Sequence, residues 1–191
     1  MNSRKPEYKI SPIILNRWSS RAMSGEEITN DELMSLFEAA KWAQSSYNAQ
    51  PWRFIYAKRN SKNWQNFFDL LIPFNQGWCK NAAVLIIVVS RKNFEFNDKF
   101  SVTHSFDTGA ACENMALQGS INGLVVHAMG SFDYEGAAKA INLPDKFEVN
   151  AMFAIGKPGK VEDLPKEMQE REVMSDRKKL KEIVFEGEFS K

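Results

Sequence analysis

The chain lacks the sequence signatures of several large enzyme classes. It contains no GxxxxGK[ST] phosphate loop, no GxGxxG after an expected strand and no GxSxG turn. These motifs place backbone N–H groups or a nucleophile at the start of a helix. Their absence disfavours nucleotide-loop enzymes and α/β-hydrolases.

Cysteine and histidine are scarce. Cys79 and Cys112 are far apart in sequence, with no CxxC spacing and no neighbouring histidine pair. Neither a disulfide scaffold nor a zinc site is indicated, and we expect two buried thiols. His104 and His127 are the only histidines, and neither has a nucleophile or a second metal ligand close in sequence. We interpret both as structural.

Long apolar runs and excess charge are also missing. The longest apolar run, residues 82–89, is far shorter than the roughly 20 residues that cross a bilayer. The first ten residues lack the apolar region of a secretory signal, so we predict a cytoplasmic protein without a membrane partner. Lys plus Arg is 25 against 24 for Asp plus Glu, which gives no global attraction to nucleic acid. Any anion site must be local.

What is present is typical of one globular domain. The chain has 191 residues, of which 43% are hydrophobic and 26% charged, enough for a single core. Thr29 and Glu32 have capping-box spacing before an apolar stripe, which predicts a helix over residues 30–42. The unbroken run at 82–89 predicts a central strand with both faces covered. Further strands are expected at 53–57, 123–130 and 147–156. Further helices are expected around 64–71, 105–122 and 133–140, and Pro73 helps to end the first of them. Helices and strands alternate, so the class is α/β or α+β.

The expected helix at 105–122 has an unusual composition. Phe106, Ala110, Leu117 and Ile121 form one apolar stripe, and small residues occupy much of the remainder. Small side chains let another helix or backbone approach closely. We therefore predict a buried or interface helix.

The last part of the chain differs in composition from the rest. Residues 157–191 are heavily charged and include two prolines, yet they contain the apolar triplet IVF at 183–185. A solvated tail would not need that triplet. We predict an arm that packs on its own domain or on a partner subunit.

The segment RWSSR is the first candidate site. Arg17, Ser19 and Arg21 point to one side if the segment is extended, and two guanidinium groups beside a hydroxyl can clamp a phosphate or a carboxylate. The alternative is a solvated basic patch.

The segment SSYNAQPW at 45–52 is the second. Its hydroxyl and amide side chains can donate to and accept from the edge of a heterocycle. The alternative is a turn at the end of a helix with Asn48 in a left-handed conformation and Trp52 in the core. At 129–132, MGSF offers a glycine whose N–H could approach a ligand, or an ordinary turn. The basic run at 175–181 is mostly typical of a solvated surface.

In combination, these segments resemble the FMN-dependent nitroreductase family. Its motif R-x-S-x-R matches 17–21, S-S-x-N-x-Q-P-W matches 45–52, D-x-G-x-A-x-x-N-M-x-L-Q matches 107–118, M-G-G-F corresponds to 129–132, and a basic tail corresponds to 177–187. The likeness runs from Asn16 to Phe185. Gln44, Ser131 and Lys179 replace a proline, a glycine and a proline of the family pattern.

The resemblance implies an α+β fold with a mixed central sheet flanked by helices, and an intertwined homodimer that binds FMN at the dimer interface. The N-terminal arginines with Arg177 would hold the phosphate, the 45–50 turn would come from the partner subunit, and the backbone at Gly130 and Ser131 would face the flavin N5 edge. It implies no catalytic acid–base pair and no metal ligand, because the hydride chemistry belongs to the cofactor. The implied cofactor-binding residues are Arg17, Trp18, Ser19, Arg21, Ser45, Ser46, Asn48, Gln50, Asn75, Met129, Gly130, Ser131, Arg177 and Lys178.

The implied activity is an oxidoreductase that uses NADH or NADPH to reduce nitroaromatic, quinone or related acceptors by a ping-pong mechanism. One domain would span 1–191, with 157–191 as an arm on the partner subunit. Three alternatives stay open. They are specialised flavin chemistry, for which no lid insertion is visible, a flavin store or sensor without turnover, and an anion or nucleic-acid binder, which the lack of aromatic residues near 178–181 disfavours.

Overall fold

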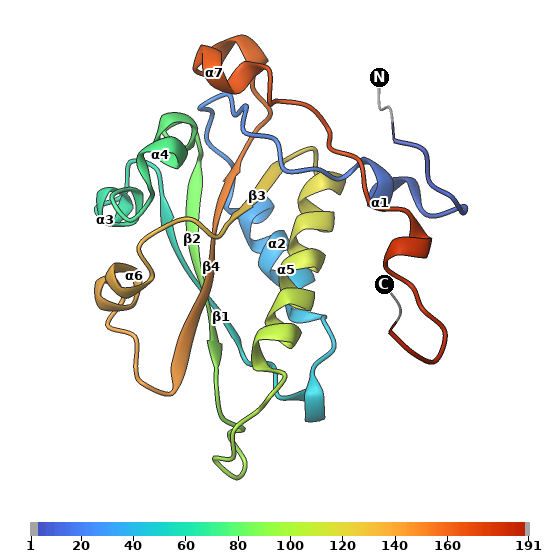
Figure 1. Ribbon diagram of the computed structural model, residues 1–191. Coiled ribbons are helices and arrows are strands. Elements are labelled where there is room, and N and C mark those ends of the chain that lie inside the picture. The colour runs from blue at the N-terminus through green and yellow to red at the C-terminus, as the bar shows by residue number, and fades with distance from the viewer. Residues whose placement is uncertain (1–3, 190–191) are drawn as a thin grey trace.

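The computed structural model describes residues 4–189, which form one four-stranded sheet with helices on both faces (Figure 1). The strand order is β1-β2-β4-β3 and every neighbouring pair is antiparallel. The predicted α+β class is confirmed, but the described strands do not pair in mixed directions. β2 and β3 run the same way, because each of them pairs antiparallel with β4, which lies between them. The strands are β1 (Trp52–Lys58), β2 (Val84–Arg91), β3 (Val125–Met129) and β4 (Phe147–Gly156).

The helices begin where capping residues allow. Thr29 Oγ1 accepts from Glu32 N at 3.1 Å and Glu32 Oε2 accepts from Thr29 N at 2.6 Å, so the predicted capping box is present. Asp133 caps the predicted helix after it by accepting from Gly136 N. The helices are α1 (Pro12–Asn16), α2 (Asn30–Lys41), α3 (Trp64–Phe68), α4 (Pro73–Cys79), α5 (His104–Ile121), α6 (Tyr134–Ala140) and α7 (Lys166–Gln169), with 3-10 turns η1 (Ser46–Asn48), η2 (Val161–Asp163) and η3 (Leu180–Glu182).

Pro73 begins a helix that the sequence did not predict. We expected this residue to help end the preceding helix, but it occupies the first turn of α4. The first position suits proline because its missing N–H would have no partner there. Asn75, one of the implied cofactor-binding residues, therefore lies on a helix.

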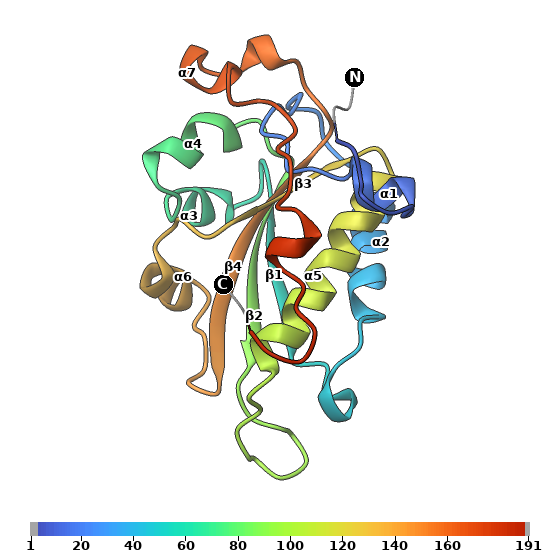
Figure 2. The ribbon, with the colours of Figure 1, turned by 45° about the vertical axis from the view of Figure 1, so that its right-hand side comes forward.

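The sheet is covered on both faces, as predicted from the β2 run. α2 and α5 lie over one face and α3, α4 and α6 over the other (Figure 2). Leu85 and Ile87 point into one cluster, while Ile86 and Val88 point into the other, and all four are fully buried.

α5 packs on the sheet through small residues and Met115. Ala111 and Met115 are fully buried, and a Cβ at Gly119 would overlap the side chain of Val126. The larger residues of the stripe face away, with Phe106 74% and Ile121 64% exposed. In the single chain, this leaves an apolar strip of α5 uncovered.

The cysteines and histidines occupy structural positions. Both thiols are free and shielded, and burial raises the pKa of each, that of Cys112 to about 12. His104 is buried with Nδ1 2.7 Å from Ser90 Oγ. Over residues 4–189, no helix has the length and apolar character needed to span a bilayer.

The arm at 157–189 divides into two parts. Leu164 and Met168 are buried in the core of their own chain. Beyond residue 172 the chain runs beside the N-terminal segment, where Leu180 N donates to Glu7 Oε1 at 2.8 Å. Ile183 and Val184 are 55% and 61% exposed there, so their own chain leaves them largely uncovered.

Candidate functional site

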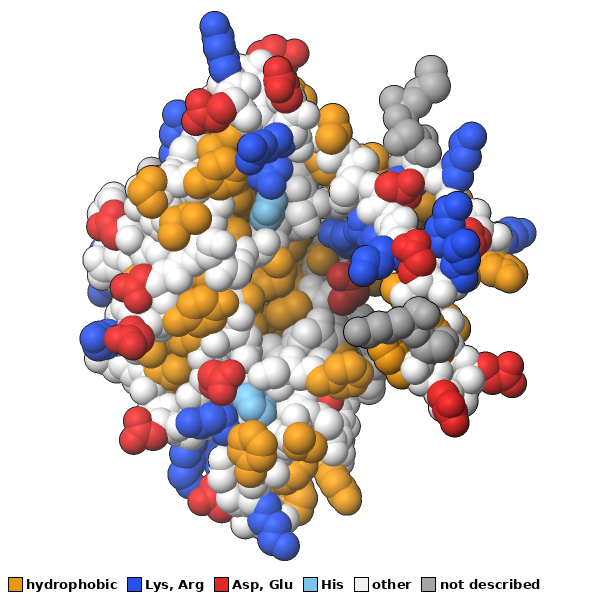
Figure 3. All heavy atoms as spheres, viewed as in Figure 1, with side chains coloured by type: hydrophobic (Ala, Val, Ile, Leu, Met, Phe, Trp, Pro, Cys, Tyr) orange, Lys and Arg blue, Asp and Glu red, His pale blue; other side chains and the backbone are white. Residues whose placement is uncertain are grey.

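Both ends of the chain meet in one polar cavity of about 330 Å³, here termed the arginine pocket. Figure 3 shows Lys and Arg side chains on both sides of a hollow between the body of the molecule and the two terminal segments. Five arginines in one cavity make a strongly cationic site in a chain of net charge +1. The lining residues are Arg4, Arg17, Trp18, Ser19, Arg21, His127, Ala128, Arg171, Val173, Ser175 and Arg177.

Most of the predicted phosphate residues lie in this pocket. Arg17 leaves α1 with an extended backbone, and the segment that follows brings Ser19 and Arg21 to the same cavity, where Arg177 of the arm joins them. Arg17 Nε also lies 3.5 Å from Glu113 Oε1 on α5. Lys178 is exposed and does not line the pocket.

Two arginines of the pocket were not predicted. Arg4 donates from Nη1 to the carbonyls of Leu15 and Arg17 and from Nε to that of Ser175, so it joins the N-terminal segment to the arm. Burial and the neighbouring arginines lower the pKa of Arg4 from its ordinary value. Arg171 enters from the arm. Neither residue belongs to a local motif, so the sequence carried no signal for them.

His127 also borders the pocket. Its Nδ1 lies 2.9 Å from the Ser20 carbonyl and its ring packs on Trp78 at 4.5 Å, which agrees with a structural role. Burial is the largest cause that lowers its pKa. The ring is therefore neutral near pH 7 and adds little charge to the pocket.

The end of β3 lies against α4. Asn75 Nδ2 donates to the Ser131 carbonyl at 3.0 Å and Asn75 Oδ1 accepts from Trp78 Nε1 at 3.3 Å. Met129 is buried, whereas Gly130 and Ser131 are exposed. Both polar atoms of the Asn75 side chain are thus hydrogen-bonded, and they hold the end of β3 against α4.

The turn at 45–50 has a strained backbone. Tyr47, Asn48 and Gln50 have φ values of 53°, 51° and 46°. Non-glycine residues seldom adopt this left-handed region, and such strain often collects at functional sites. Asp107 Oδ2 accepts from Ser46 N at 3.1 Å, and Ser45 Oγ accepts from Gln50 N at 3.0 Å. The left-handed Asn48 and the buried Trp52 both agree with the simple-turn alternative, which does not account for the left-handed backbone of Tyr47 and Gln50.

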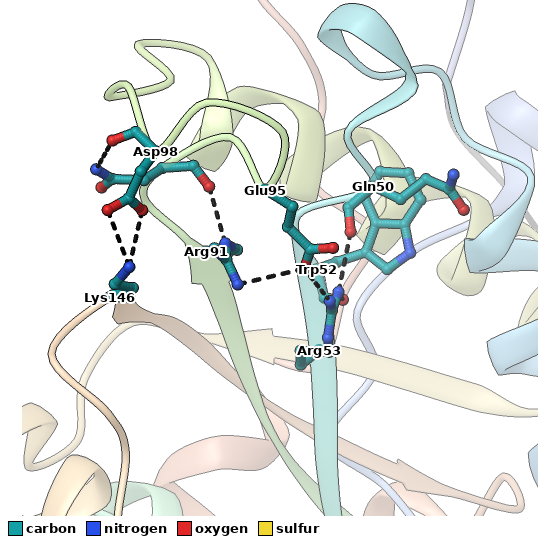
Figure 4. Close-up of polar contacts among 8 residues, drawn as sticks. Gln50, Trp52, Arg53, Arg91, Glu95, Asp98 and Lys146 are labelled. Carbon is teal, nitrogen blue, oxygen red and sulfur yellow. Dashed lines mark hydrogen bonds and ion pairs between the residues drawn. The ribbon is translucent and has the colours of Figure 1, made fainter.

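Exposed aromatic rings stand beside this turn and form what we term the aromatic cluster. Tyr47 is 82% exposed, and its ring lies 5.7 Å from that of Phe94 and 6.0 Å from that of Phe96. Glu95, between the two phenylalanines, pairs with Arg53 and Arg91 at 3.3 Å each (Figure 4). The ion pairs connect the loop to β1 and β2, and the loop places the rings of Phe94 and Phe96 beside Tyr47.

The turn and the arginine pocket lie apart in one chain. Ser46 is bonded to Asp107 in the first turn of α5, whereas Arg17 pairs with Glu113 further along that helix. In both ribbon views the turn lies at the foot of the molecule and the terminal segments lie higher (Figures 1 and 2). A single chain does not unite the two groups of predicted residues.

A model of the nitroreductase family matches residues 14–157. The chain belongs to this family. The predicted family and α+β fold are thereby confirmed, and the chain is an oxidoreductase of the nitroreductase type.

Individual relatives agree with this assignment. A solved structure described as an oxidoreductase containing FMN is 41% identical, with a TM-score of 0.95, and the match covers 100% of this chain and 98% of that one. A putative NADH dehydrogenase/NAD(P)H nitroreductase of Rhodopseudomonas palustris (strain TIE-1) is 23% identical over 141 residues, 68% of this chain and 71% of the relative. An oxygen-insensitive NADPH nitroreductase of Helicobacter acinonychis (strain Sheeba) is 32% identical over 84 residues, 43% of this chain and 39% of the relative.

Proposed function

We propose that this chain is a cytoplasmic, homodimeric FMN-dependent oxidoreductase that uses NADH or NADPH to reduce nitroaromatic, quinone or related acceptors by a ping-pong mechanism. The arginine pocket is the observation that carries the proposal. Five guanidinium groups line one cavity, and Glu113 and Glu172 offset only part of their mutual repulsion, so a bound anion would be favoured there. The 41% identical solved structure is described as containing FMN, whose phosphate is such an anion.

The donor set of the pocket fits a phosphate monoester. A phosphate carries nearly two negative charges at neutral pH and binds best to planar guanidinium forks. Arg17, Arg21 and Arg177, with the Ser19 hydroxyl, would hold it, and Arg171 would add to the same set. Trp18 would supply an apolar wall, while Lys178 would contribute at longer range.

The strand end beside the pocket suits a flat ring system. A Cβ at Gly130 would have only Tyr134 Oη near it among the described residues, at 3.9 Å. The described part of the chain therefore leaves room for a larger side chain at this position. Close approach of a ligand to the backbone would require the glycine. Met129, Gly130 and Ser131 would face the ring edge, with Asn75 holding the Ser131 carbonyl. Bound FMN would supply the two-electron transfer chemistry of the flavin.

A second copy of the chain would complete the site. The turn residues Ser45, Ser46, Asn48 and Gln50 would reach the flavin of the partner subunit, because their own arginine pocket lies elsewhere. The uncovered apolar strip of α5 and the exposed Ile183 and Val184 of the arm support a large interface. One domain would span 1–191, with the later part of the arm packed on the partner.

The purified protein is expected to be yellow. NADH or NADPH should bleach the flavin absorption under anaerobic conditions, and double-reciprocal plots should give parallel lines, because donor and acceptor occupy one pocket in turn. A yellow protein that no reductant bleaches would indicate the store or sensor alternative. A colourless protein with salt-dependent DNA binding would indicate the anion-binder alternative.

The aromatic cluster is expected to select flat acceptors. Removal of the Phe96 ring by Phe96→Ala should raise KM for a nitroaromatic about fivefold, which is the scale of one aromatic pair. The KM for ferricyanide, which cannot stack, should stay unchanged. Phe100→Ala is the matched control, because Phe100 is exposed in the same loop but packs on His104 outside the cluster. Equal effects of the two variants on steady-state KM would contradict this role.

A further inference from the structure

Glu172 is a buried carboxylate that joins the arm to the loop of the N-terminal arginines. Its side chain is 1% exposed. The Oε1 atom accepts from Ser20 Oγ at 2.6 Å, from Arg21 N at 2.7 Å and from Ala22 N at 3.0 Å. The Oε2 atom makes no hydrogen bond and lies 3.7 Å from Arg21 Nη1.

These contacts can fix the shape of the loop. A buried carboxylate is costly unless its charge is compensated, and here a hydroxyl, two backbone N–H groups and a guanidinium compensate it. Charge-assisted hydrogen bonds to one oxygen are short and directional. The Ser20–Ala22 backbone is therefore held in one position relative to the arm.

The position of Glu172 connects both halves of the arginine pocket. Arg21 follows Ser20 on the loop, while Arg171 precedes Glu172 on the arm. Arg4 makes a second connection between the N-terminal segment and the arm. Here a cationic side chain donates to the carbonyls of Arg17 and Ser175. Glu172 as an acceptor and Arg4 as a donor thus bring together segments that lie more than 150 residues apart in sequence.

Glu172 itself does not line the arginine pocket. As an anion it would repel a phosphate, so direct contact would oppose binding. Its effect on an anion in the pocket must pass through the backbone and the guanidinium that it holds.

We propose that Glu172 is a positioning residue that preforms the phosphate-binding arginine pocket from the two ends of the chain. The proposal rests on the proposed function, because it takes the phosphate of FMN as the bound anion. It predicts that loss of the carboxylate weakens the hold on the phosphate and leaves the ring system's contacts unchanged.

The test compares FMN with riboflavin, which has the same ring system and no phosphate. Apoprotein carrying Glu172→Ala should bind FMN at least tenfold more weakly by fluorescence titration, because three donors of the loop lose their acceptor. Riboflavin affinity should stay within about twofold of wild type. Glu170→Ala is the matched control, since it removes an exposed carboxylate two residues away.

Two milder variants keep the test decisive if the Glu172→Ala protein does not fold. Glu172→Gln keeps an acceptor oxygen without the charge, and Ser20→Ala removes one donor, so each should weaken FMN binding about threefold and spare riboflavin. An FMN-to-riboflavin affinity ratio equal to wild type in Glu172→Ala, or in both milder variants if that protein does not fold, would overturn the proposal. Wild-type protein that binds no FMN would instead overturn the proposed function, so the two failures are distinguishable.

Discussion

Replacing Arg17 and Arg21 by alanine is expected to release FMN from the purified protein. Both guanidinium groups line the arginine pocket, and a hydrogen bond to a charged group contributes about 1.5–3 kcal/mol. Loss of both should weaken FMN binding by roughly 10²- to 10⁴-fold. The flavin-to-protein ratio after gel filtration and an FMN titration of the apoprotein measure the effect.

The fold should survive this double replacement. Arg17 leaves behind Glu113, whose side chain is 57% exposed and can be hydrated. Arg21 leaves behind the buried Glu172, which loses its guanidinium partner but keeps the hydrogen bonds to Oε1 from the Ser20 hydroxyl and two backbone N–H groups. Lys58→Ala/Lys157→Ala is a control with the same charge change at exposed contacts with Asn30 and Glu26, and it should keep its FMN. Full FMN occupancy in the Arg17→Ala/Arg21→Ala protein would remove these two residues from the phosphate site.

The fold was predictable where local patterns act alone. The capping box at Thr29 and Glu32 marks the start of α2, and the apolar run at 82–89 marks the central strand. The directions of strand pairing were not predictable, because they depend on where β4 inserts, and the mixed sheet that we expected is antiparallel in the described residues. Pro73 can end one helix or begin the next, and only the tertiary structure decides.

The candidate site was predictable to a similar degree. Arg17 and Arg21 converge because an extended backbone repeats every two residues, which the sequence displays directly. Arg4 and Glu172 meet the same loop only through contacts between distant parts of the chain, so no local pattern marks them. Asn48 commonly tolerates a left-handed backbone, but Tyr47 does not, and its conformation follows from the contacts around the turn.

Mixing two inactive variants is expected to restore activity if the site is shared between subunits. The Arg17→Ala/Arg21→Ala protein lacks the phosphate contacts, whereas Ser46→Ala/Asn48→Gly lacks the side chains of the turn. Glycine at 48 keeps the left-handed backbone, whose φ is 51°. Each homodimer should be nearly inactive. A heterodimer should contain one site with both defects and one intact site.

Random reassociation should therefore restore about a quarter of the wild-type activity, since half of the dimers are mixed and each has one intact site. The measurement is NAD(P)H-dependent acceptor reduction after the two variants are unfolded and refolded together with FMN, with different affinity tags to quantify the heterodimer. Refolding either variant with itself provides the control. Heterodimers that form and stay inactive would show that each site takes its turn and its arginine pocket from the same subunit, because a site shared across the interface must be rebuilt when each subunit supplies the half that the other lacks.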